Sequence, residues 1–198
     1  DHWRQLGNTG WSFDDVLPYF RRAEDQERGA DELHGAGGPL AVSDVSEANP
    51  LCDAFIAASQ QAGHPRNEDF NDGEQDGIGW YQVTERNGAR CSAAVGYLHP
   101  VMSRPNLTVE THVHALSVLF ENGRAVGVVG ARLSEMVVNR AEREVIVCGG
   151  AYNTPQLLML SGIGDPSGLK AVDVKPRVPL PGVGKNLQDH ISAPITYA

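Results

Sequence analysis

The sequence predicts an α/β fold with a mixed sheet, and three patterns in its 198 residues support this prediction. Two capped segments with helical spacing of apolar residues lie before position 64. After Pro105, apolar residues recur with a period of two, which is typical of half-buried strands. Residues 145–148 form a continuous apolar run that ends in glycines and precedes a helix, as in a parallel strand buried on both faces.

The first helix is expected over residues 14–25, with Ser12 as its cap and acidic residues in its first turn. Pro18 lies near its start and allows a kink or a later beginning. A short strand is expected over residues 40–43.

The second helix begins with Asn49 as its cap and Pro50 as its first residue, and Gly63 ends it. Its apolar stripe is expected to consist of Leu51, Phe55 and Ala58. Residues 64–90 are polar, and we expect a surface excursion with little regular structure.

A third helix is expected over residues 92–102, with Ser92 as its cap and Pro100 as a distortion. Period-two patterns then predict strands over residues 107–111, 115–121 and 125–131. Asn122 and Gly123 both tolerate positive φ, so they predict a tight hairpin between the last two strands.

Composition and charge narrow the classes of function. The chain is 41% hydrophobic and 21% charged, which is ordinary for a soluble globular protein. Its formal net charge of −9 argues against a nucleic-acid partner, because phosphate binding needs a surplus of Lys and Arg. We find no transmembrane-length apolar segment and no secretory leader. The composition therefore predicts a cytoplasmic protein, with peripheral membrane association left open.

The three cysteines are far apart and lack metal-site spacing. We expect Cys52, Cys91 and Cys148 to be small buried hydrophobic residues in a reducing compartment. His112 and His114 are two residues apart on an expected strand, so they share a face. No third ligand is suitably spaced, and no metal site is predicted.

The segment after the apolar run combines a small-residue turn with a helix. Gly149, Gly150 and Ala151 allow another group to approach the backbone closely. Thr154 is the expected helix cap, Pro155 the first helical residue, and Gly162 a left-handed terminator. Unpaired N–H groups at such a helix start favour an anion. The turn indicates either close strand–helix packing or contact with a cofactor phosphate or ring.

This segment, GAYNTPQLLMLSGIG, resembles the second signature of the glucose-methanol-choline (GMC) oxidoreductases, which are FAD-dependent. Other stretches that resemble this family follow in the family's order and cover nearly the whole chain: GWSFDDVLPYFRRAED, HGAGGPL, RCSAAVGYL and LPGVGKNLQDH. The resemblance implies an incomplete FAD-binding domain of the Rossmann-like type with a mixed sheet, plus the edges of an α+β substrate domain. The GxGxxG fingerprint of the family is not found here.

The family's catalytic histidine belongs to a region C-terminal to Ala198, so the resemblance implies the middle portion of a longer enzyme without a catalytic residue of its own. We expect a helical connecting segment, a substrate-domain strand edge, part of the FAD-binding domain and a crossover into the substrate domain, over residues 1–36, 37–48, 49–180 and 181–198. Alone, the chain is expected to be inactive and to lose FAD on purification.

The resemblance also implies a reaction and a set of cofactor contacts. The parent enzyme would oxidise a primary alcohol, choline-like or other, to an aldehyde by hydride transfer to FAD; the electron acceptor stays open. An FAD-containing hydroxynitrile lyase and an inert truncated chain are the alternatives. The backbone of Ala115 is expected at the adenine ring. The expected wall of the adenosine and diphosphate site is formed by Cys148, Gly149, Gly150 and Ala151.

Three further residues attract attention but are interpreted as structural. Asp189 and His190 are adjacent on an extended segment, so their side chains point to opposite faces and do not form an acid–base pair. Ser161 lies at a helix end and lacks the GxSxG context of a nucleophile.

Overall fold

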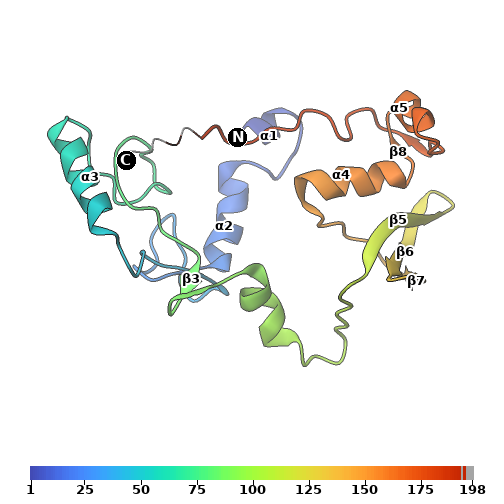
Figure 1. Ribbon diagram of the computed structural model, residues 1–198, viewed down its shortest axis with the longest axis horizontal. Coiled ribbons are helices and arrows are strands. Elements are labelled where there is room, and N and C mark those ends of the chain that lie inside the picture. Colours follow the sequence, from blue (N-terminus) through green and yellow to red (C-terminus); the bar gives the residue numbers. More distant parts are fainter. Residues whose placement is uncertain (193, 195–198) are drawn as a thin grey trace. The chain divides into compact units, whose positions relative to one another are not determined.

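The computed structural model describes residues 1–192 and residue 194, and the chain forms two compact units, Asp1–Val109 and Glu110–Ala198. Figure 1 shows the helices and strands of both units along the chain. The boundary between the units falls inside the segment 49–180 that was expected to be part of one domain; the four-segment division concerns functional domains and stays a prediction. No helix within the described residues is long and apolar enough to cross a membrane.

The first unit begins with the short helix α1 (His2–Gln5) and the amphipathic helix α2 (Phe13–Ala23). A capping box starts α2: the N–H of Asp15 donates to the Ser12 hydroxyl at 3.2 Å, and the N–H of Ser12 donates to the Asp15 carboxylate at 3.1 Å. Pro18 lies inside the helix. The predicted helix and its cap are therefore confirmed.

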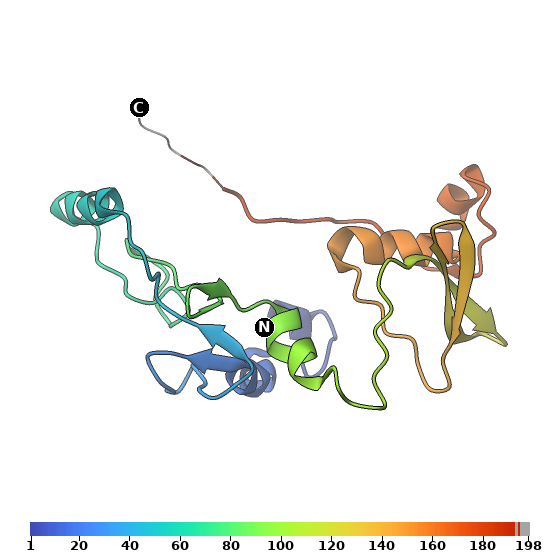
Figure 2. The same ribbon diagram turned by 60° about the horizontal axis from the view of Figure 1, so that its bottom comes forward.

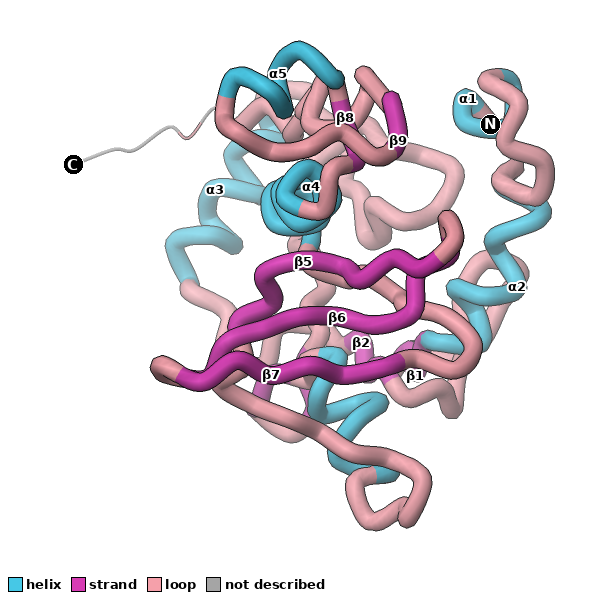
Figure 3. Tube along the Cα trace, turned by 90° about the vertical axis from the view of Figure 1, so that its right-hand side faces the viewer, coloured by secondary structure: helices cyan, strands magenta, loops and turns pink. Residues whose placement is uncertain are grey.

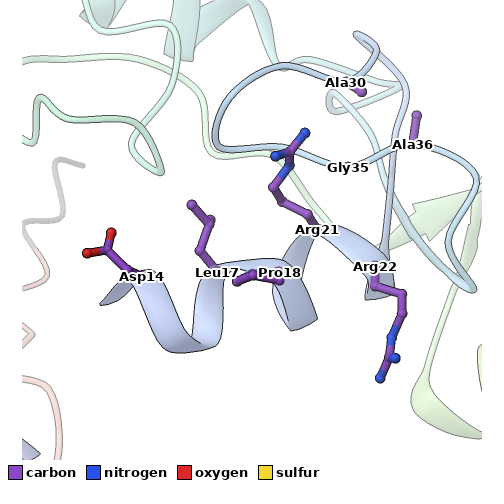
Figure 4. A pocket seen from close by; sticks show the side chains of 8 residues that line it. All are labelled: Asp14, Leu17, Pro18, Arg21, Arg22, Ala30, Gly35 and Ala36. Atoms are coloured by element: carbon purple, nitrogen blue, oxygen red, sulfur yellow. The ribbon is translucent and has the colours of Figure 1, made fainter. Parts of the chain in front are cut away.

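A parallel pair of short strands follows α2, namely β1 (Glu24–Gln26) and β2 (Leu40–Val42). The loop between them folds back against the end of α2 at Gly35 (Figure 4). A Cβ atom at Gly35 would overlap the carbonyl oxygen of Arg21, so only glycine allows this approach. Close packing against Arg21 thus explains why position 35, in the HGAGGPL stretch, is a glycine.

Helix α3 (Pro50–Gln61) is capped as predicted, because the Asn49 side chain accepts from the N–H of Leu51 at 2.9 Å. The predicted apolar stripe is wrong. Leu51 and Phe55 are 76% and 56% exposed, and Ile56 is the buried residue of the helix. Within the first unit, α3 stands apart from α2 in Figures 1 and 2.

Residues 64–90 are mostly irregular, as predicted, and contain the small hairpin of β3 (Glu85–Arg86) and β4 (Ala89–Arg90). A π-helical turn, η1 (Ala94–Leu98), then continues into a 3-10 turn, η2 (His99–Val101). The Ser92 hydroxyl accepts from the N–H of Val95 at 3.3 Å. The predicted third helix is therefore confirmed as a distorted, two-part helix.

The second unit contains an antiparallel sheet in the order β5 (His114–Glu121), β6 (Arg124–Arg132) and β7 (Glu135–Arg140) (Figure 3). Asn122 and Gly123 have φ of 50° and 79° and form the predicted hairpin turn. The strand predicted over residues 107–111 is absent, and β7 was not predicted.

Helix α4 (Gly150–Leu160) lies beside β5, on the side away from β6 in Figure 3. After it come β8 (Ile163–Gly164), α5 (Pro166–Ala171) and β9 (Val178–Pro179), with β8 and β9 paired in parallel. Gly162 has a φ of 87°, which confirms the predicted left-handed terminator of α4.

The strand predicted over residues 145–148 does not form, and Ile146 is 75% exposed. A strand needs a neighbour for its backbone hydrogen bonds. No described strand pairs with this segment, and residues 145–148 have no regular secondary structure.

Candidate functional site

The turn before α4 differs in detail from the prediction. The helix begins at Gly150, four residues before the expected cap Thr154. Gly149 is the capping residue, and its N–H donates to the Thr154 hydroxyl at 2.9 Å. The Thr154 side chain thus lies inside the helix and accepts from the capping residue Gly149. The first helical residue, Gly150, has a φ of 78°, which glycine adopts without strain.

The start of α4 provides backbone donors. The N–H groups of the capping residue and of the first three helical residues have no intrahelical acceptor. Here they belong to Gly149, Gly150, Ala151 and Tyr152, and that of Gly149 donates to Thr154. All four residues are exposed, and a Cβ atom built on Gly150 would meet no atom within 4 Å. The first turn carries no acidic side chain. The open surface and the positive helix end therefore suit an anionic group.

Cys148 lies directly before this turn and is exposed, as is Cys52. The expectation that all three cysteines are buried is wrong for these two. Cys91 is buried at 1% exposure, and its sulfur accepts from the N–H of Ala41 at 3.4 Å. The burial of Cys91 follows from its position under β2, which the spacing of cysteines along the chain does not reveal.

Ala115 is an exposed residue near the start of β5, where it pairs with Gly130. A register shift follows it, between Ala115 and Ser117. β6 pairs with only one edge of β5; α4 lies beside the other edge, where the N–H of Val118 donates to the Ser161 hydroxyl. The structure places Ala115 and the turn at residues 148–151 in the same unit, and their contact with a cofactor remains a prediction.

The two histidines expected on one strand face are separated. His112 has a φ of 59° and lies in a bend before β5, and only His114 belongs to the strand. The prediction of a shared strand face is therefore wrong. In the described part of the chain no group of three or more His, Cys, Asp or Glu residues is placed to hold a metal ion.

Near the C-terminus, the backbone N–H of His190 donates to the Asp189 carboxylate at 2.8 Å. This is a local turn contact, and no side-chain pair of the two residues is present in the described structure. The interpretation of Asp189 and His190 as structural is consistent with this geometry.

The first unit holds a cavity that the sequence does not predict. It has a volume of about 580 Å³ and lies between α2, β2 and residues 82–84. Apolar side chains form most of its lining, with His34, Asn71 and Gln82 among the polar residues. A second cavity of about 480 Å³ lies on the other side of α2, where Figure 4 shows Asp14, Leu17 and Arg21 on the helix.

His34 is buried beside two carboxylates, and no sequence pattern within the HGAGGPL stretch indicates them. Its Nδ1 lies 3.1 Å from the Asp31 carboxylate, and its Nε2 lies 3.4 Å from the Asp69 carboxylate. Burial favours the neutral ring, but the hydrogen bond to Asp31 and the charge of Asp69 together raise the pKa of His34. The only local sequence signal for this arrangement is the spacing of Asp31 and His34, three residues apart.

Comparison with known proteins identifies the chain's relatives. A family model described as GMC oxidoreductase matches residues 1–192. Human mitochondrial choline dehydrogenase is 47% identical over 198 residues, which is 100% of this chain and 33% of that protein. The chain thus spans about a third of the length of this relative.

Comparison with solved structures also finds flavin enzymes and oxidases that are similar to this chain. Pyridoxine 4-oxidase from Mesorbium loti matches with a TM-score of 0.85 and 36% identity, over 93% of this chain and 36% of that one. An FAD-dependent oxidoreductase from Chaetomium thermophilum matches with a TM-score of 0.86 and 28% identity, over 94% of this chain and 35% of that one. These similarities confirm the predicted α/β fold class and the family resemblance.

Proposed function

We propose, since the chain belongs to the GMC oxidoreductase family, that it forms part of a flavin-dependent enzyme that oxidises a primary alcohol to an aldehyde. The observation that carries the proposal is the 47% identity to human choline dehydrogenase along the whole chain. Choline or a similar small alcohol is therefore the substrate we propose. The cytoplasmic location and the absence of a nucleic-acid partner remain predictions from composition.

The start of α4 fits the phosphate groups of FAD. The free N–H groups of Gly150 and Ala151, with the positive end of the helix, would hold a phosphate. Gly149 and Gly150 add no side chain that would block the approach, and the Cys148 side chain flanks the turn. Ala115 would contribute its backbone near the start of β5.

The chemical roles divide between cofactor and protein. FAD, when bound, supplies a hydride acceptor for the carbon that carries the hydroxyl group. The residues of this chain bind and orient, because none of the described side chains is assigned as the base for the hydroxyl proton. A general base typically contributes about 10²- to 10⁴-fold in rate, so binding by this chain alone does not complete the catalytic apparatus.

A chimeric enzyme tests the proposal. This chain would replace the matching third of human choline dehydrogenase, with the unmodified human enzyme as the reference. We expect the purified chimera to show a flavin absorbance spectrum and to reduce a dye when choline is added. Assays with molecular oxygen instead of the dye distinguish oxidase from dehydrogenase behaviour.

Three other outcomes are informative. A folded chimera without flavin would contradict the proposed cofactor role of the chain. Flavin that is reduced by another primary alcohol but not by choline would retain the reaction and reject the substrate. Flavin that no alcohol reduces, together with cleavage of a hydroxynitrile, would favour the lyase alternative.

A further inference from the structure

His34 joins two loops of the first unit. It lies in the loop between β1 and β2, and it is only 6% exposed. Its backbone N–H donates to the Asp31 carboxylate at 2.6 Å, and its ring lies between Asp31 and Asp69. Asp69 belongs to the irregular stretch at residues 64–79, which we call the acidic loop.

The protonation state of His34 decides whether its ring attracts the second carboxylate, that of Asp69. A neutral imidazole has one N–H group, so it donates to one carboxylate and turns a lone pair toward the other. The imidazolium donates from Nδ1 to Asp31 and places its protonated Nε2, and its positive charge, 3.4 Å from the Asp69 carboxylate. The arrangement of the two carboxylates is therefore complementary to protonated His34.

The other charged groups around His34 come from neighbouring elements. Glu24 on β1 adds a further negative charge, and its carboxylate accepts from the N–H of Gly35 at 2.9 Å. Arg28 opposes these charges from the loop after β1, where it faces Asp69 and pairs with Asp44. Burial disfavours the imidazolium, but the hydrogen bond to Asp31 and the charges of Asp69 and Glu24 outweigh it and raise the pKa of His34.

The acidic loop has few other attachments. It is closed internally by the bridge between Arg66 and Ile78 and by the Asn67 side chain, which donates to the carbonyl of Glu74 at 2.8 Å. Within the described residues, side-chain polar contacts join this loop to the β1–β2 region at two points. These are Arg28 with the carbonyl of Glu68, at 2.8 Å, and His34 with Asp69.

We propose that His34 is a protonation-controlled clamp that holds the acidic loop against the β1–β2 region. The clamp also acts on the cavity of about 580 Å³, because His34 lines it from one side and Asn71 of the acidic loop lines it from another. Loss of the proton removes one of the two attachments and frees this part of the cavity wall. The inference is independent of the proposed cofactor site, which lies in the other unit.

The direction with pH follows from the raised pKa. The clamp contributes its full stabilisation below the ordinary histidine pKa of about 6.5. This contribution is lost as the pH rises through the higher pKa of the folded protein. The acidic loop is thus closed under mildly acidic conditions and opens toward alkaline pH.

Hydrogen exchange of residues 1–198, corrected for the intrinsic effect of pH, tests the clamp between about pH 5.5 and 8.5. We expect peptides from the acidic loop to lose protection as the pH rises, while peptides from the β5–β6 hairpin serve as the internal reference. His34→Gln should lower protection at the acidic end of the range to the level that the unsubstituted protein reaches at alkaline pH, and it should abolish the pH dependence. The control His64→Gln changes an exposed histidine at the start of the same loop, and it should behave as the unsubstituted protein.

Asp69→Asn provides a second test that does not rely on the His34 variant folding. An NMR titration of the His34 ring should show a lower pKa in Asp69→Asn than in the unsubstituted protein, because one stabilising charge is lost. The proposal is overturned if the acidic loop is equally protected at both ends of the pH range. It is also overturned if the pKa of His34 is the same in both proteins, or if the pH dependence persists in a folded His34→Gln.

Discussion

The hydroxyl group of Ser161 accepts a hydrogen bond from the backbone N–H of Val118 at 2.8 Å and donates to the carbonyl of Leu157 at 2.6 Å. Both Ser161 and Val118 are buried. The serine of the SGIG stretch therefore attaches the end of α4 to the edge of β5 that does not pair with β6. This contact fixes the helix whose other end carries the candidate cofactor turn.

Ser161→Ala should destabilise the second unit by about 1–3 kcal/mol, because the buried N–H of Val118 loses its acceptor. Urea unfolding and hydrogen exchange at the Val118 amide would measure the effect. Ser134→Ala is the matched control in the same unit, since Ser134 is exposed; it should change stability by no more than about 0.5 kcal/mol. Equal stability of the two variants would refute a stabilising role for the Ser161 contact.

Gly35→Ala should destabilise the first unit by about 1–3 kcal/mol or more, because its Cβ atom overlaps the backbone of Arg21. Gly73→Ala is the control, since a Cβ atom there meets nothing within 4 Å. Thermal or urea unfolding would compare the two. A Gly35→Ala protein as stable as Gly73→Ala would show that the loop does not need this close approach.

Ser12→Ala should raise the pKa of Asp15 toward its ordinary value. Hydrogen bonds from the hydroxyl and the backbone N–H of Ser12 hold this pKa below that value in the native protein. A lowered carboxylate pKa contributes stability above the ordinary value of about 3.9 and loses it as the pH falls through the folded value. NMR titration of Asp15 measures the change, with Ser103→Ala as control. An unchanged pKa in Ser12→Ala would contradict the capping box as its cause.

Ala115→Ser should leave flavin binding nearly unchanged in the chimera, whereas Ala115→Pro should weaken it, because proline alters the backbone and removes the N–H group. Ala131→Pro, on the neighbouring strand β6, controls for damage to the sheet. Calorimetric titration with FAD would compare all four proteins. Equal losses in the two proline variants would argue against cofactor contact at Ala115.

Local patterns predicted the features whose hydrogen bonds close within a few residues. The Ser12 and Asn49 caps and the Asn122–Gly123 turn belong to this class, and the structure confirms them. The candidate turn was predicted in the right place, but the helix start was misplaced because Thr154 reaches back to Gly149. Gly150 in this turn also has a positive φ, which the sequence pattern does not specify.

Features that depend on distant residues were not predictable in this way. The run at residues 145–148 has a strand pattern, but strand formation depends on a neighbour that the pattern does not supply. The ring of His34 meets Asp69, which is 35 positions further along the chain, and the Ser161 hydroxyl meets Val118 over a separation of 43 residues. Such pairs follow from tertiary folding, so a single sequence gives little signal for them.

The flavin content of an Ala151→Leu chimera tests the central claim most directly. A leucine side chain at the start of α4 would occupy the space in front of the free N–H groups, so we expect flavin affinity to fall by about tenfold or more, equivalent to about 1.4 kcal/mol. Ala171→Leu, at the exposed end of α5, is the control and should keep the flavin content of the unsubstituted chimera. Helix content by circular dichroism should be the same in all three proteins. Full flavin loading in a well-folded Ala151→Leu chimera would contradict the assignment of this turn to the cofactor.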